Sequence, residues 1–72
     1  MKLSEVAVGQ SATITKLYEN GAIKRRIMDM GLTKGTKIEV VKVAPLGDPI
    51  ELTVRGYQLT LRKADAMLIE VA

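Results

Sequence analysis

Residues 50–61 read IELTVRGYQLTL, and this stretch decides the fold. In residues 50–54, and again in residues 57–61, apolar side chains alternate with polar ones. Two alternating runs separated by only two residues, one of them Gly56, are typical of a β-hairpin with a tight turn. The chain is therefore expected to consist mainly of short antiparallel strands, with Gly56 in a structural role.

The hairpin is preceded by residues 44–49, which read APLGDP. Two prolines and a glycine within six residues cannot continue a strand ladder, so a stiff loop is predicted here. In one interpretation the loop only fixes the turn, which is the structural role assigned to Pro49. In the other it contacts a partner protein, because an apolar side chain at a loop tip is a natural anchor. The candidate contact residues of this loop are Pro45, Leu46, Gly47 and Asp48.

Three further strands are predicted, two before this stretch and one after it. Residues 12–18 and 67–71 alternate regularly, whereas the alternation in residues 37–43 slips near Val40–Val41. A β-bulge, or burial on both faces, would explain the slip, and a bulge bends a strand as a small barrel requires. Residues 63–66 are expected to form a turn or a single helical turn.

One helix is predicted over residues 22–30. Asn20 is a suitable N-cap, and Gly31 is a natural terminator in the left-handed region. With Gly31 in this position, Leu32 would cover Ile27 in a Schellman ending. Gly31 and Leu32 are therefore assigned structural roles.

The faces of this helix divide its side chains into two groups. Arg26 borders the buried stripe and is expected to lay its stem on the core and pair with an acid such as Asp48 or Glu51, a structural role. Residues on the other side are expected to face solvent, or a partner. At about 100° per residue, the stripe that should face the core consists of Ile23, Ile27 and Met30. The candidate contact residues of the helix are Lys24, Arg25 and Met28.

Five short strands and one helix in 72 residues indicate a single domain, residues 1–72. Five strands are too few for a deep sandwich, and closing them into a barrel removes the exposed sheet edges. The predicted class is mostly β: a small five-stranded SH3-like barrel with one α-helix inserted at about residues 22–30. Gly35 is expected to serve the turn after the helix, and Tyr57 the rim of the core.

The composition argues against an enzyme, because the chain has no His and no Cys to act as a general base or a soft nucleophile. Residues 31–36 superficially resemble a phosphate-binding loop, but Lys34 precedes Gly35, whereas that loop needs Lys after its second Gly. Carboxylates such as Asp48 and Glu51 stand without the imidazole that transition-metal sites usually include. We expect no catalytic residue, cofactor, metal site or small-molecule substrate.

The net charge of +3 favours acidic partners only mildly. With two tyrosines as the sole aromatic residues, there is little surface for stacking nucleic-acid bases. No apolar run approaches the roughly 20 residues of a membrane span, and no signal-peptide pattern stands at the start. A cytoplasmic location without membrane insertion is therefore expected, and nucleic-acid binding is not favoured.

Several segments together resemble the FeoA family, small cytoplasmic accessory proteins of bacterial ferrous-iron uptake. The resemblance covers essentially the whole chain, with one departure at Lys34, where the family usually has proline. The segments that carry it are RRIMDMGL at 25–32, GT at 35–36, APLGDP at 44–49, VRGY at 54–57 and LTLR at 59–62.

The resemblance implies an SH3-like barrel and a partner, FeoB, a membrane ferrous-iron transporter with a cytosolic GTPase domain. It implies a non-enzymatic protein that docks on the cytosolic side of FeoB and supports or modulates it, without carrying iron. Arg25 acting as an arginine finger on that GTPase is a further possibility, against the simpler reading of a surface arginine. The alternative function is a nucleic-acid-binding barrel, or a barrel module allied to iron-dependent repressors.

Overall fold

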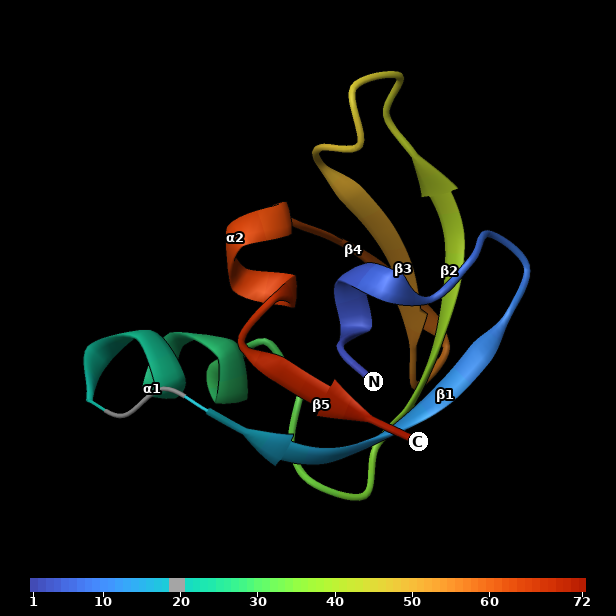
Figure 1. Ribbon diagram of the computed structural model, residues 1–72. Helices are drawn as coiled ribbons and strands as arrows, with labels where there is room; N and C mark the ends of the chain where they lie inside the picture. Colours follow the sequence, from blue (N-terminus) through green and yellow to red (C-terminus); the bar gives the residue numbers. More distant parts are fainter. Residues whose placement is uncertain (19–20) are drawn as a thin grey trace.

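The computed structural model describes residues 1–18 and 21–72, so the expected N-cap at residue 20 lies outside the described residues. These described residues form five strands, two α-helices and a 3₁₀ helix wrapped around one interior (Figure 1). The elements are η1 (Leu3–Glu5), β1 (Ser11–Leu17), α1 (Ala22–Asp29), β2 (Lys37–Val43), β3 (Ile50–Val54), β4 (Tyr57–Leu61), α2 (Lys63–Ala66) and β5 (Ile69–Val71).

The five strands form one antiparallel sheet in the order β4-β3-β2-β1-β5. β1 pairs with β2 through residues 11–13 and with β5 through residues 14–17, so it turns the sheet from one wall to the next. β4 and β5 are the two ends of this order, and α2 connects them (Figure 1). The sequence led us to expect full closure by strands. In the described residues the gap between β4 and β5 is instead spanned by α2, which lets β4 keep one unpaired edge.

The hairpin forms as predicted. Five residue pairs join β3 and β4, ending with Val54 opposite Tyr57. The two turn residues, Arg55 and Gly56, both have positive φ, at 51° and 85°. This is the twisted type I′ geometry that suits a two-residue connection.

The irregularity in residues 37–43 is a β-bulge. Val40 pairs with Leu52 and Lys42 pairs with Glu51, so Val41 is the extra residue in β2. β1 has a second irregularity between Ile14 and Lys16, at the position where it leaves β2 for β5. Bulges increase local bending and twist, and these two lie in the two longest strands of the sheet.

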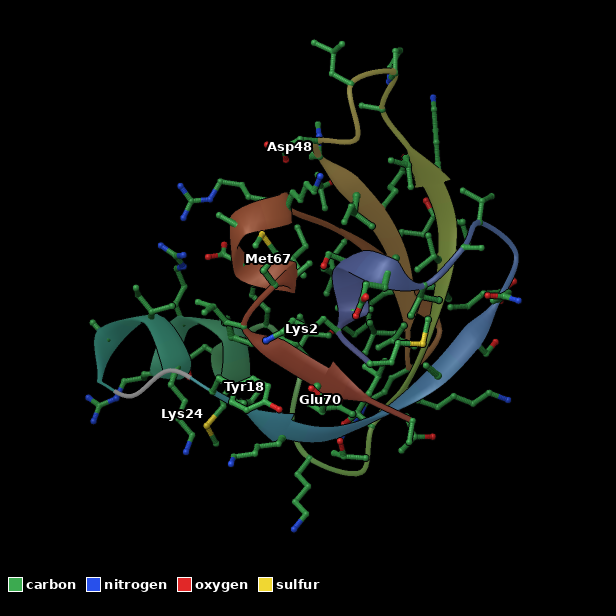
Figure 2. All side chains as sticks on the ribbon, in the orientation of Figure 1. Lys2, Tyr18, Lys24, Asp48, Met67 and Glu70 are labelled. Carbon is green, nitrogen blue, oxygen red and sulfur yellow. The ribbon has the colours of Figure 1, made fainter. Side chains whose placement is uncertain are left out.

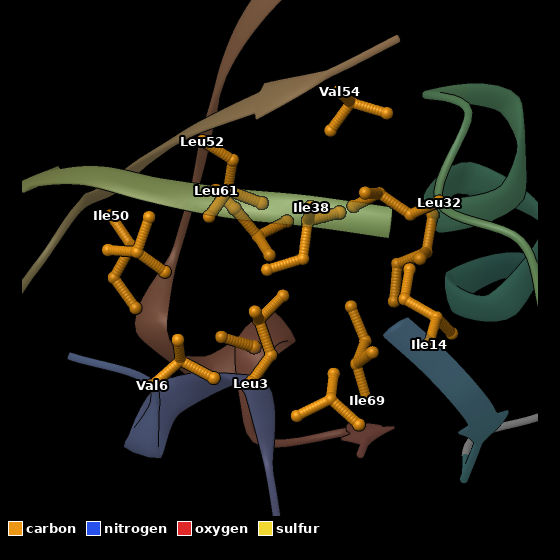
Figure 3. Packing of buried hydrophobic residues seen from close by; sticks show 14 residues of the cluster. Leu3, Val6, Ile14, Leu32, Ile38, Ile50, Leu52, Val54, Leu61 and Ile69 are labelled. Atoms are coloured by element: carbon orange, nitrogen blue, oxygen red, sulfur yellow. The ribbon is translucent and has the colours of Figure 1, made fainter. Parts of the chain in front are cut away.

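The core is a single aliphatic cluster to which every strand contributes. Figure 3 shows its side chains converging from the sheet and from η1, which lies against one end of the cluster. Val8, in contrast, is 57% exposed and lies outside it. The buried apolar residues are Leu3, Val6, Ile14, Ile27, Leu32, Ile38, Val40, Ile50, Leu52, Val54, Leu61, Ala66, Ile69 and Val71.

The helix α1 ends in the Schellman motif expected from the sequence. The Gly31 N–H donates to the Met28 carbonyl at 2.9 Å, and the Leu32 N–H donates to the Ile27 carbonyl at 3.3 Å. Gly31 has φ 93°, and both Ile27 and Leu32 are buried. The predicted apolar stripe is narrower than expected, because Ile23, one turn before Ile27, is 38% exposed.

Two strand boundaries differ from the predictions. β1 covers Ser11–Leu17 and not residues 12–18, while β5 begins only at Ile69. Met67, predicted to open the last strand, is the C-cap of α2 and is 49% exposed. Neither described helix combines the length and apolar character needed to cross a bilayer.

Candidate functional site

The exposed side of α1 carries the first group of predicted contact residues, here called the helix surface: Lys24, Arg25 and Met28. Met28 is 43% exposed although it is apolar. All three residues line one shallow depression together with Gly21 and Asp29. The helix surface is thus an apolar side chain flanked by two cations, as the sequence predicted for this face.

The opposite side of α1 is fixed to the barrel by a salt bridge. Nη2 of Arg26 donates to both carboxylate oxygens of Asp65 at 3.0 Å, and Nε of Arg62 donates to one of them at 3.3 Å. Asp65 is only 6% exposed and belongs to α2. The predicted partners of Arg26, Asp48 and Glu51, were therefore wrong, because α2 and not the proline loop lies beside this face of α1.

Tyr57 holds the end of α1 from the hairpin. Its hydroxyl donates to the Met30 carbonyl at 2.5 Å, which satisfies one of the carbonyls left free at a helix C-terminus. A Cβ at Gly31 would collide with the same hydroxyl, so this close approach requires glycine. Tyr57 itself is 45% exposed and does not belong to the buried core.

The turn after α1, which contains Lys34, is closed by two backbone hydrogen bonds. The Thr36 N–H donates to the Thr33 carbonyl at 3.0 Å, and the Gly35 N–H donates to the Ile14 carbonyl at 2.7 Å. Gly35 has φ 89°, which supports the structural role assigned to it. Lys34 is exposed beside this turn.

Residues 44–49, here called the proline loop, carry the second group of predicted contact residues. Leu46 is 94% exposed at its tip. The Gly47 N–H donates to the Ala44 carbonyl at 2.7 Å, and the Ala44 N–H donates to the Pro49 carbonyl at 3.1 Å. The loop is therefore closed on itself while its apolar tip faces solvent.

Asp48 ties the proline loop to α2, because its Oδ1 accepts a hydrogen bond from the Lys63 backbone N–H at 2.9 Å. Lys63 is the first residue of α2, so its N–H has no partner within the helix. The bond gives Asp48 a structural contact besides the contact role predicted for it. The sequence carries no local signal for the bond, since 15 residues separate the two.

The helix surface and the proline loop lie at different places on the molecule. In Figure 1 α1 and the loop between β2 and β3 project from separate sides of the barrel, and Figure 2 places Lys24 and Asp48 far apart. The structure therefore does not bring the two groups of predicted contact residues into one surface.

A polar cluster that the sequence did not reveal joins β1 to β5. The Tyr18 hydroxyl donates to Oε1 of Glu70 at 2.8 Å, the Met1 amino group contacts the other carboxylate oxygen, and the Lys2 ammonium lies 4.4 Å from the centre of the Tyr18 ring (Figure 2). The Met1 amino group, followed by Tyr18, lowers the pKa of Glu70. The hydrogen bond to Glu70, followed by desolvation, raises the pKa of Tyr18.

Metal-ligating side chains do not gather in the described part of the chain. Among residues 1–18 and 21–72 no three of His, Cys, Asp and Glu are grouped so that they could hold a metal ion. Asp65 is the one buried carboxylate in these residues, and two arginines already bind it.

The family model of the FeoA domain matches residues 1–72. The chain belongs to the FeoA family. A curated FeoA relative is the "Fe(2+) transport protein A/Fe(2+) transporter FeoB fusion protein" of Porphyromonas gingivalis, which is 41% identical over 71 residues. The match covers 99% of this chain and 8% of the fusion protein, so the relative is far longer than the domain described here.

Solved FeoA structures have the same fold. The solution structure of iron(II) transport protein A from Clostridium thermocellum is 45% identical, with a TM-score of 0.95 over 99% of this chain and 44% of its own. The FeoA of Stenotrophomonas maltophilia, crystallised with zinc and described as an SH3 domain protein, is 30% identical, with a TM-score of 0.86 over 100% of this chain and 89% of its own. The predicted SH3-like class is confirmed.

The same fold occurs in transcriptional repressors. A manganese-dependent repressor matches 100% of this chain and 40% of its own length, with a TM-score of 0.89 at 15% identity. At this identity the likeness concerns the fold alone.

Proposed function

We propose that this FeoA chain is a non-enzymatic accessory protein of ferrous-iron uptake that docks on the cytosolic side of FeoB and modulates its activity. The observation that carries the proposal is the relative in which the same domain, at 41% identity, is fused to a FeoB transporter. A domain joined covalently to a transporter acts at a high local concentration beside it. The S. maltophilia protein, described as a candidate activating factor of ferrous iron transport, supports the same role.

The contacts would come from the helix surface and from the tip of the proline loop. Met28 and Leu46 are apolar and exposed, and exposed apolar side chains rimmed by charge are typical of protein contacts. Because the two surfaces lie apart, each would meet a different part of the transporter, or one of them would be free. They are therefore tested separately.

The test is a titration of purified cytosolic FeoB domain with the chain and with two variants, Met28→Asp and Leu46→Asp. We expect at least one of the two variants to weaken binding tenfold or more, because a buried contact side chain carries roughly 1–2 kcal/mol or more. The control is Val8→Asp, which places the same charge at an exposed apolar residue outside both surfaces. Undiminished binding of both contact variants would remove these surfaces from the proposal.

The GTPase part of the proposal has its own measurement. Arg25 stands on the helix surface and is exposed, so it could reach a partner's nucleotide. An arginine finger raises GTP turnover by about a thousandfold or more. Because Arg25 is read as a surface arginine, we expect the turnover rate of FeoB to be the same with Arg25→Ala as with the wild-type chain; a large fall would instead assign Arg25 the role of the finger.

A further inference from the structure

The two end strands of the sheet differ in what lies along their outer edges. The edge of β5 is covered, because the Val71 N–H donates to the Met1 carbonyl at 2.7 Å and Lys2 forms a bridge with Glu70. β4 pairs with β3 on one side, and no described residue pairs with its backbone on the other. An uncovered edge is a template for another strand.

The hydrogen-bonding direction of each strand residue can be followed from β1 across the sheet. Val40 donates to the Gln10 carbonyl at 3.0 Å and accepts from the Gly9 N–H at 2.7 Å, so its backbone faces away from β3. The direction alternates along an antiparallel strand, so Glu39 faces β3, where it lies opposite Thr53. The backbone N–H and C=O of Thr53 therefore point toward β2.

The same alternation shows which groups of β4 are free. Because Thr53 faces β2, the residues on either side of it face β4. Gln58 lies opposite Thr53, and Thr60 lies opposite Glu51. Both residues therefore turn their N–H and C=O away from β3, and both are exposed. The outer edge of β4 offers two donors and two acceptors in the spacing of a strand.

Beside this edge lies a hollow of about 280 Å³ with a positive rim. Its single acid, Asp65, is already bonded to two arginines, whose side chains are 49% and 65% exposed. Guanidinium groups have five N–H donors, so both arginines have donors left for a second anion. The residues that line the hollow are Arg26, Met30, Thr60, Leu61, Arg62 and Asp65.

The charges around β4 disfavour pairing with a second copy of the same strand. Arg55 stands at its start, and Arg62 and Lys63 stand at its end. In an antiparallel pair of two β4 strands, Arg55 of each copy would approach Arg62 and Lys63 of the other. Like charges placed opposite each other are destabilising, whereas an acidic strand would meet cations at both ends.

We propose that the outer edge of β4 binds an extended acidic segment of a partner protein, which adds to the sheet as a further strand. The backbone of Gln58 and Thr60 provides the strand pairing, and Arg26 and Arg62 select negative charge. This site uses neither the helix surface nor Leu46 at the tip of the proline loop. It does not depend on the proposed docking to FeoB.

The test is an NMR titration of the ¹⁵N-labelled full chain with the peptide acetyl-TEVEVT-amide, which alternates acidic with apolar residues. We expect the amide signals of Gln58 and Thr60 to shift and their hydrogen exchange to slow at least tenfold at saturation. The same peptide with lysine in place of glutamate should bind at least fivefold more weakly. A peptide N-methylated at every residue keeps the charge, but its methyl groups prevent the close approach of a paired strand, so it should not protect these amides.

The matched pair of protein variants is Arg62→Gln and Lys37→Gln, which remove one cation beside the edge and one away from it. We expect the first to weaken binding by roughly fivefold and the second to leave it unchanged. The proposal is overturned by no shift at millimolar peptide or by equal binding of the lysine peptide. It is also overturned if the shifts spare Gln58 and Thr60, or if those amides are protected by self-association of the chain.

Discussion

The barrel and the inserted helix α1 are held in place in different ways. The barrel combines continuous strand ladders with a core to which all five strands contribute. α1 contributes one buried side chain, Ile27, and is otherwise fixed by Arg26 on Asp65 and by Tyr57 on the Met30 carbonyl. The barrel therefore depends on many small contributions, whereas the placement of α1 depends on a few contacts that can be removed one at a time.

The largest effect is expected in the barrel. Leu52 is fully buried at the centre of β3, so Leu52→Ala removes apolar contacts and leaves a cavity. We expect a loss of about 2–5 kcal/mol in the free energy of unfolding, with every amide losing protection together. The measurement is denaturant unfolding combined with hydrogen exchange. Thr53→Ala, the neighbour on the other face, should cost less than about 1 kcal/mol; similar losses would refute a core centred on Leu52.

The second-largest loss of stability is expected from a change at the C-terminal end of α1. Gly31→Ala forces a side chain into φ 93° and against the Tyr57 hydroxyl, so we expect a loss of about 2 kcal/mol. Gly9→Ala is the matched control, because Gly9 has φ 88° and open space around its Cβ position.

Thermal unfolding of the two variants separates backbone strain from collision. Gly31→Ala should be the less stable, and adding Tyr57→Phe should recover part of the difference. Equal losses of stability in Gly31→Ala and Gly9→Ala would show that the Tyr57 hydroxyl moves aside at no cost.

Removing the salt bridge between α1 and α2 is expected to have a smaller effect on stability. Asp65→Asn removes the carboxylate that Arg26 and Arg62 share. Because the two arginine side chains are 49% and 65% exposed, we expect a loss of only about 1–2 kcal/mol. Hydrogen exchange should speed up in α1 before the barrel strands. Asp29→Asn, on the exposed side of α1, is the control; an equal response would mean that the salt bridge does not position the helix.

The smallest effect concerns the cluster where β1 ends. The pKa of Glu70 is lowered from 4.5, so its contribution to stability is present above pH 4.5 and is lost as the pH falls through the lowered value. The pKa of Tyr18 is raised from 10.0, so its contribution is lost only as the pH rises beyond 10. Unfolding measured from pH 3 to 7 should show Glu70→Gln to be less stable near neutrality and less sensitive to acid. If the stability of Glu70→Gln and that of the wild-type chain changed with pH in the same way, Glu70 would be excluded as the titrating group.

The sequence predicted features whose causes lie within a few residues. The hairpin turn follows from Gly56 between alternating runs, the bulge from the slip at Val40–Val41, and the helix ending from Gly31 and Leu32. Each is a local backbone preference: the turn and the helix ending are confirmed, and of the two explanations for the slip the structure shows the bulge. The exposure of Met28 also follows from helix periodicity alone.

Contacts between distant segments were missed, because spacing along the chain does not give distance in space. Arg26 and Asp65 are 39 residues apart, and Tyr18 and Glu70 are 52 apart. Arg26 was correctly expected to need an acid, but the choice among acids depends on α2 packing beside α1. Tertiary packing also decided that Ile23 is exposed although it shares the apolar stripe.

The bulge in β2 bends the strand without interrupting its pairing with β3. Val41 has no partner in β3, and the residues before and after it alternate in phase once it is left out. A chain lacking this one residue would keep the same partners and the same inward side chains, yet its second strand would run straight. The bend in β2 thus depends on one inserted residue, so deleting Val41 is expected to flatten this strand while each of the other residues keeps its partner in β3.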